Sequence, residues 1–122
     1  MEITKYIENG DLEGVKNCLK NGADIHAKND WALRLSAGNG HIEIVKYLLE
    51  NGANIHATGD YALRMSAYNG HLEIVKYLLE NGANIHARGD EAVKMAIENN
   101  KQDVVEFLTN FNPITRIKSA KK

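Results

Sequence analysis

Apolar and polar positions alternate along the chain in two short helical patterns that recur every thirty residues. Over residues 41–50 apolar side chains return at helical spacing, and acidic and basic residues that can pair at i+3 and i+4 occupy the other face. Residues 31–38 form a second, shorter pattern in which Ser36 and Ala37 are small enough to let neighbouring helices approach closely. Asn-Gly pairs follow both segments and end them, because these residues tolerate positive φ. The pattern predicts an all-α chain of helix hairpins.

The thirty-residue period is most visible at Ile25, Ile55 and Ile85, each inside an Ala-Asp/Asn-Ile-His-Ala string. A hairpin of this length is too small to bury its own apolar faces, so stacking must close the core. We therefore predict one domain over 1–122. Its parts are an N-terminal capping unit at 1–30, units at 31–60 and 61–90, a C-terminal capping unit at 91–114 and a basic tail at 115–122.

The two end units carry polar or small residues where the inner units are apolar. Gly14 and Asn17 stand where the second unit has Ile44 and Tyr47. Similar replacements occur in the fourth unit, and Pro113 stops the pattern there. These substitutions predict outward-facing caps and a finished array.

Composition narrows the possible partners. The 122 residues are 43% apolar and 25% charged, and the formal net charge of −1 gives no electrostatic argument for nucleic acid or an anionic membrane. No apolar run is long enough for a membrane span, and Cys18, the one cysteine, excludes an intrachain disulfide. We expect a monomer in the cytoplasm, or in the host cytoplasm if the protein is viral.

Five histidines, separated by steps of fifteen residues, suggest a metal site only at first sight. Equivalent positions in stacked helices lie roughly 8–10 Å apart, whereas zinc needs nitrogen ligands at about 2.1 Å. We expect His41 and His71 to satisfy backbone N–H groups at helix starts, and His26, His56 and His86 to form a loop-to-loop hydrogen-bond row. No metal or other cofactor is expected.

No set of residues suggests catalysis. Ser36, Ser66 and the histidines all occupy framework positions of the repeat, so no nucleophile and base can be assigned. The tripeptide at 88–90 reads Arg-Gly-Asp, but the equivalent residues 58–60 read Thr-Gly-Asp, so Gly-Asp belongs to the repeat itself. The chain is not expected to be an enzyme.

Residues 69–85 read Asn-Gly-His-Leu-Glu-Ile-Val-Lys-Tyr-Leu-Leu-Glu-Asn-Gly-Ala-Asn-Ile, which resembles the second half of an ankyrin repeat. Related strings occur in all four units. The first half departs from the family: residues 31–37 read Trp-Ala-Leu-Arg-Leu-Ser-Ala, and the period is shorter than the usual length of about 33 residues. This short variant is similar to the ankyrin arrays of giant amoeba-infecting viruses. The resemblance implies an ankyrin-type repeat solenoid of four units with shortened loops.

The resemblance also implies a binding surface, because ankyrin proteins generally bind partner proteins through loop tips and the exposed side of their first helices. The shorter loop should shift contact toward the helices of a concave face. Tryptophan, tyrosine and arginine are enriched at interface hot spots. By alignment, the exposed candidates are Asp30, Trp31, Arg34, Tyr61, Arg64, Tyr68, Arg88, Glu91, Lys94 and Glu98.

Two interpretations of these residues remain open. They contact a partner, or Trp31 and Tyr61 pack on neighbouring loops while the arginines pair with Asp30 and Asp60. Asp30 and Asp60 also precede the first helix of their units and are plausible N-caps.

For the chain as a whole we expect a protein–protein interaction module. The alternative is a structural or engineered scaffold with no natural target, possibly self-associating, because the second and third units differ at only five of their positions.

Overall fold

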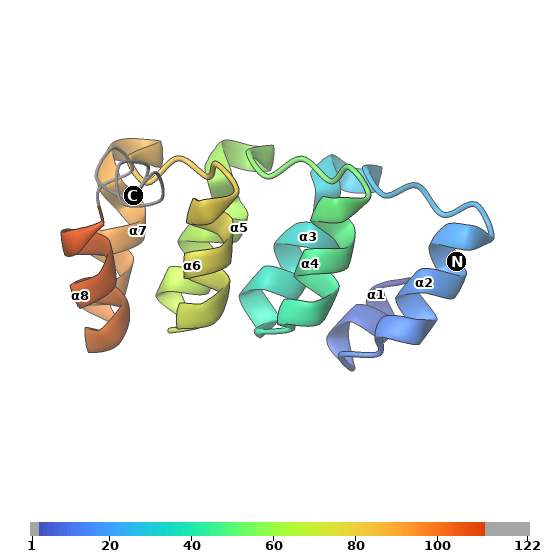
Figure 1. The fold of residues 1–122 in the computed structure, drawn as a ribbon, viewed down its shortest axis with the longest axis horizontal. Helices are drawn as coiled ribbons and strands as arrows, with labels where there is room; N and C mark the ends of the chain where they lie inside the picture. Colours follow the sequence, from blue (N-terminus) through green and yellow to red (C-terminus); the bar gives the residue numbers. More distant parts are fainter. Residues whose placement is uncertain (1–2, 112–122) are drawn as a thin grey trace, which may run out of the picture.

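The computed structural model of the chain describes residues 3–111, which form helices joined by turns (Figure 1). The elements are α1 (Ile3–Glu8), α2 (Leu12–Lys20), α3 (Ala27–Asn39), α4 (Ile42–Glu50), α5 (Ala57–Tyr68), α6 (Leu72–Glu80), α7 (Ala87–Glu98) and α8 (Gln102–Asn110). Within this range no strand occurs, and the predicted all-α helix-hairpin solenoid is confirmed. Pro113 and the predicted basic tail lie outside the described residues. None of the helices in 3–111 has the length and apolar character needed to cross a bilayer.

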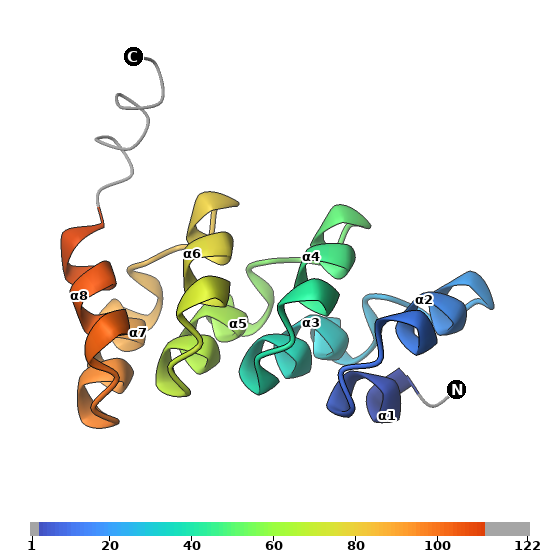
Figure 2. The same ribbon diagram turned by 60° about the horizontal axis from the view of Figure 1, so that its bottom comes forward.

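The helices form two layers, with α1, α3, α5 and α7 in one and α2, α4, α6 and α8 in the other (Figures 1 and 2). Neighbouring first helices contact each other far more extensively than neighbouring second helices do. The reason is the small pair predicted above: Ser36, Ala37, Ser66 and Ala67 are fully buried where the first helices meet. The serine hydroxyls donate to carbonyls of their own helices at 3.0 Å, so close packing leaves them satisfied.

The second helices complete the core with larger side chains. Ile44, Val45 and Leu48 of α4 are almost completely buried, as are their equivalents in α6. Because these positions recur at helical spacing, one face of each second helix rests on its own first helix and the opposite face stays polar. The core is therefore continuous along the stack rather than confined to one hairpin.

A left-handed turn precedes the regular part of each of α3, α5 and α7. Lys28, Asn29 and Asp30 have φ between 54° and 57°, and residues 58–60 and 88–90 adopt nearly the same conformation. The right-handed part of each helix follows this turn. Three successive residues in the left-handed region are costly for side chains other than glycine, asparagine or aspartate.

Thr58 is the least suitable residue in this turn, because a β-branched side chain at φ 56° is strained. Thr58→Asn is expected to raise the free energy of unfolding by about 0.5–1 kcal/mol, since asparagine tolerates the left-handed region. Urea denaturation measures the change. Lys28→Thr, which places a β-branched residue at the equivalent position of the turn in α3, should lower stability instead. Equal stability of all three proteins would show that the turn is not strained.

The aspartate of the turn connects successive units. The Asp30 carboxylate accepts a hydrogen bond from the backbone N–H of Asn54, in the next loop, at a distance of 2.7 Å. The Asp60 carboxylate accepts the equivalent bond from Asn84, also at 2.7 Å. The same carboxylates lie 3.0–3.1 Å from Nδ1 of the histidine four residues earlier, and Asp30 and Asp60 are 5% and 4% exposed. An ionised carboxylate can only accept, so the histidine nitrogen donates.

This arrangement corrects two predictions. Asp30 and Asp60 do not cap their helices, because the left-handed turn points their side chains toward the following loop. The histidines of the loops do not bond from loop to loop either: His26, His56 and His86 bond the aspartate of their own unit. Asp30 and Asp60 then make the connection to the next unit.

Asp60→Ala is expected to cost about 1–2 kcal/mol more than Asp90→Ala. Both substitutions remove an aspartate–histidine bond, but only Asp60 also accepts from the next unit, and Asp90 is exposed. Urea denaturation of the two variants gives the difference directly. Equal losses would mean that the bond between units contributes nothing.

The histidines before the second helices also act differently from the prediction. Nε2 of His71 lies 3.0 Å from the carbonyl of Gly38, and His41 makes a longer contact of 3.3 Å with the carbonyl of Glu8. A ring N–H donates to these carbonyls, so the imidazoles join units and cap nothing. Asp11, at the same position of the first unit, does cap its helix by accepting from the N–H of Gly14 at 2.9 Å.

Candidate functional site

Aromatic rings and guanidinium groups alternate along the first helices. The Arg34 guanidinium carbon lies 5.0 Å from the ring centroid of Trp31 and 5.2 Å from that of Tyr61. The Arg64 guanidinium carbon also lies 5.2 Å from the centroid of the Tyr61 ring. We call these four side chains the aromatic–arginine column. Cation–π contacts of this kind hold the rings and the charges at fixed positions.

Each arginine of the column also binds the left-handed turn at the start of its own helix. Arg34 Nε and Nη2 donate to the carbonyls of Asn29 and Lys28 at 3.0 and 2.9 Å. Arg64 makes the equivalent bonds to residues 59 and 58 at 2.9 and 2.8 Å. The predicted pairing of these arginines with Asp30 and Asp60 is wrong: among residues 3–111 the arginines bind carbonyls, and the aspartates bind histidines.

Two candidates prove to be buried instead of exposed. Asp30 is 5% exposed because the next loop covers its carboxylate. Arg64 is 5% exposed because its guanidinium is held by the turn, the Tyr61 ring and Oε1 of Glu91, which lies 3.2 Å from Nη1. Neither side chain offers a free surface, and both belong to the packing between units.

The other candidates keep at least part of their surface. Tyr68, Arg88, Lys94 and Glu98 are exposed, Tyr68 by 39%. Partial exposure is found for Trp31, Arg34, Tyr61 and Glu91. A Cβ added to Gly59 would lie 2.7 Å from Nε of Arg88, so the Arg88 side chain lies across the preceding turn.

A hollow of about 190 Å³ opens between α3 and α5 beside the column. It is lined by Trp31, Arg34, Leu35, Gly38, Asn39, Tyr61, Met65 and Asn69. Gly38 leaves it open, since a Cβ there would meet only Met65, at 3.7 Å. We call this space the first-helix hollow.

Most of the sequence differences between the second and third units lie at the first-helix hollow. Three of their five differences, at 31/61, 35/65 and 38/68, place at least one residue in its lining. Leu35 and Met65 were not among the predicted residues, although they differ between two otherwise similar units. That difference is the signal that could have identified them.

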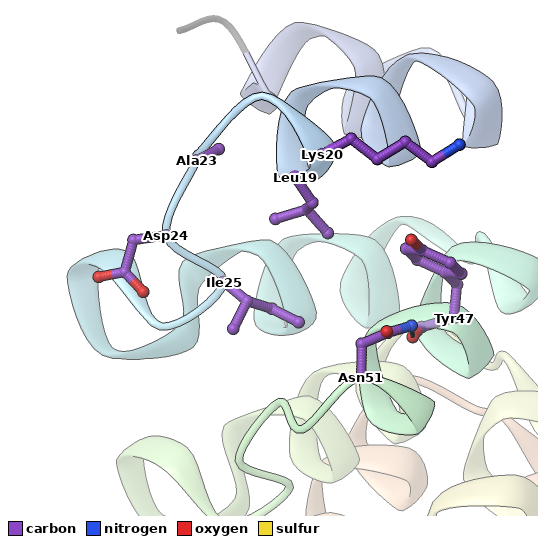
Figure 3. Close-up of a pocket in the computed structure, with 7 residues that line it drawn as sticks. All are labelled: Leu19, Lys20, Ala23, Asp24, Ile25, Tyr47 and Asn51. Atoms are coloured by element: carbon purple, nitrogen blue, oxygen red, sulfur yellow. Dashed lines mark hydrogen bonds between the residues drawn. The ribbon is translucent and has the colours of Figure 1, made fainter.

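A wider hollow of about 480 Å³ lies on the second-helix side, between the loop after α2 and the end of α4 (Figure 3). Its lining consists of Leu19, Lys20, Ala23, Asp24, Ile25, Tyr47 and Asn51. Two of its polar side chains are used locally: Asp24 accepts from the N–H of His26 at 2.9 Å, and Asn51 donates to the carbonyl of Tyr47 at 2.8 Å. This hollow therefore offers fewer free polar groups to a ligand than its size suggests.

Residues 3–111 contain no group of three or more histidine, cysteine, aspartate or glutamate side chains placed to hold a metal ion. Cys18 is free and buried. The arrangement on the first-helix side consists of aromatic rings packed against guanidinium groups, of which Arg34 is partly exposed, and a small open space, which is suited to contact with another molecule.

The family model for ankyrin repeats (three copies) matches residues 3–89 and, in a second placement, residues 56–119. The chain belongs to the ankyrin repeat family. Ankyrin repeats are generally protein–protein interaction modules and are typically not enzymes. A search of the curated proteins found no match, so the comparisons add no support to the similarity with giant-virus arrays.

In this ankyrin chain the short loop is folded into the left-handed turn, whose carbonyls bind the arginines of the column. The loop thus holds the first helix and projects little beyond it. The prediction that contact shifts from loops to helices is consistent with this geometry and remains a prediction.

Proposed function

We propose that this ankyrin repeat domain binds a partner protein through the side formed by its first helices. The observation that supports the proposal most strongly is the first-helix hollow, where Trp31, Tyr61 and Arg34 remain partly exposed around an open space. Large rings and guanidinium groups at such places are typical of interface hot spots. The proposed contact residues are Trp31, Arg34, Tyr61, Tyr68, Arg88, Glu91, Lys94 and Glu98.

Preorganisation supports the same proposal. Arg34 is fixed by two carbonyl bonds and by two ring contacts before any partner arrives. A side chain that is already ordered loses little conformational entropy on binding, so more of its contact energy appears as affinity. We propose a monomer acting in the cytoplasm, and the thirty-residue unit makes amoebal proteins the first partners to test.

Affinity capture from amoebal lysate, with the chain immobilised, tests the proposal. Gly38→Tyr fills the first-helix hollow with the residue that the third unit has at this position, and Tyr68→Ala removes an exposed ring from α5, the helix that forms one wall of the hollow. Each variant is expected to reduce capture of a specific protein by about tenfold or more, which corresponds to a loss of about 1.4 kcal/mol.

Glu73→Ala is the matched control, since this exposed side chain lies on α6, in the other layer. It should capture as much partner as the wild type. Equal capture by all variants would contradict the proposed surface. Recovery of no specific protein would favour the scaffold alternative.

A further inference from the structure

Arg34 and Arg64 occupy the same position in successive units and differ in one contact. Both donate through Nε and Nη2 to the carbonyls of their left-handed turns. Arg64 also donates through Nη1 to Glu91 of the next unit, at 3.2 Å. The residue corresponding to Glu91 beside Arg34 is Tyr61, and among the described residues no carboxylate pairs with Arg34. Arg64 of the third unit is thus paired with a carboxylate, whereas Arg34 of the second unit is not.

The charges around Arg34 favour an anion. Lys28, whose carbonyl binds this guanidinium, has an exposed side chain. Asp30, the carboxylate of the turn that binds Arg34, is turned toward His26 and the next loop. Glu91 is already paired with Arg64, and Glu8, which occupies the position of Gly38 in the first unit, is absent from the lining of the hollow. A negative group entering the hollow therefore meets a positive charge that no carboxylate neutralises within residues 3–111.

We propose that the first-helix hollow binds an acidic segment of the partner protein, with an aspartate or glutamate carboxylate on Nη1 of Arg34. This inference rests on the proposed function and specifies the chemistry of the partner. The carboxylate takes the position that Glu91 holds on Arg64. Hydrogen bonds between a guanidinium and a carboxylate are stronger than those between neutral groups, so this contact carries specificity.

An apolar side chain next to the carboxylate completes the fit. Leu35 and Met65 are partly buried apolar residues in the lining, and Trp31 and Tyr61 stand beside them. A cavity of about 150 Å³ is enough to hold benzene, and the hollow measures about 190 Å³. It therefore admits one side chain of the size of leucine or phenylalanine. The partner segment has an acidic residue adjoining a large apolar one.

Selection from a random-peptide phage library on the wild-type chain tests the inference without a known partner. Enriched peptides are synthesised with a fluorophore, and their dissociation constants are measured by fluorescence anisotropy. The expected peptides carry an aspartate or glutamate beside a large apolar residue. Replacing that acid by its amide should weaken binding to the wild-type chain about tenfold.

Two variants of the chain test the site itself. Tyr61→Glu reproduces the Arg64–Glu91 pair one unit earlier, so an internal carboxylate competes with the peptide. It should weaken peptide binding about tenfold. In this variant, replacing the peptide's acid by its amide should hardly change the dissociation constant. Gly38→Tyr fills the hollow without touching Arg34's bonds and should weaken binding similarly. Glu73→Gln, a change of an exposed side chain on α6 in the other layer, should bind as the wild type does.

Urea denaturation shows whether each variant is folded. If Tyr61→Glu does not fold, the binding measured with Gly38→Tyr tests the site. Enriched peptides without an acidic residue, affinities unchanged in both variants, or no enrichment of carboxylate peptides would each overturn the inference. Selected peptides that lack an acidic residue but bind the Tyr68→Ala variant less tightly would overturn the inference and still support the proposed interaction surface. Failure of the inference can therefore be told apart from failure of the proposed function.

Discussion

Arg64→Met is expected to lower the free energy of unfolding by about 2–4 kcal/mol. The substitution removes two bonds to carbonyls of the left-handed turn and an ion pair with Glu91, all from a side chain that is 6% exposed. Hydrogen bonds to charged groups contribute about 1.5–3 kcal/mol each, and breaking a buried ion pair costs about 3–5 kcal/mol. The expected loss is at the lower end because the Glu91 side chain, 35% exposed, can be solvated.

Arg34→Met is the matched control. It removes the same two carbonyl bonds from a partly exposed side chain that has no ion pair within the described residues. The free energy of unfolding should fall about half as much as in Arg64→Met. Urea denaturation measures both variants. A stable Arg64→Met variant that fails to bind the partner would restore Arg64 as a contact residue, as the sequence suggested.

Gly14→Ile is expected to lower the free energy of unfolding by about 2–3 kcal/mol, although isoleucine is the residue at this position in the two inner units. A Cβ on Gly14 would fall on the ring of Tyr6. Tyr6 stands where the inner units have Ser36 and Ser66, so the first unit exchanges the large and the small side chain between its helices.

A double-mutant cycle separates this exchange from a simple loss of packing. Tyr6→Ser alone removes the ring that covers Gly14 and should also destabilise the protein, by about 1–3 kcal/mol. Tyr6→Ser together with Gly14→Ile recreates the inner-unit pair, so the double variant should be about 2 kcal/mol more stable than the sum of the two losses implies. Additive losses, measured in urea, would show that the two side chains do not compensate each other.

This pair also corrects an interpretation of the sequence. The alignment predicts Gly14 and Asn17 on the outward face of the cap. Asn17 is exposed, but Gly14 is buried under Tyr6. Alignment shows which residue is replaced and cannot show that a second replacement, on the preceding helix, fills the space.

The fold was predictable because its signals are local and repeated. Apolar spacing indicated the second helices, the Asn-Gly pairs indicated their ends, and the small pair Ser36 and Ala37 indicated close contact between first helices. Each of these signals is present in a single unit. The period then extends them along the chain.

The left-handed turn was not predictable by the same means. Glycine, asparagine and aspartate tolerate positive φ, but each turn also contains a residue without that preference, namely Lys28, Thr58 or Arg88. Without the turn, the sequence could not indicate that Asp30 points away from its helix. The hydrogen bonds of Arg34 and Arg64 also depend on this turn, because only its conformation presents the carbonyls that accept them.

The candidate site was partly predictable for a related reason. Residue type and alignment placed Trp31, Arg34 and Tyr61 on one side of the array, and the structure brings them together. The burial of Arg64 depends on Glu91, which belongs to the next unit. A contact between units that differ in sequence carries no signal within either unit.

Trp31 permits the most direct test of binding at the first-helix hollow, because it is the only tryptophan of the chain. Incorporating 5-fluorotryptophan gives a single fluorine resonance from the lining of the hollow. Addition of the captured partner, or of the selected acidic peptide, should shift or broaden this resonance in a saturable way. Binding confirmed by anisotropy while the resonance stays unchanged would contradict the account.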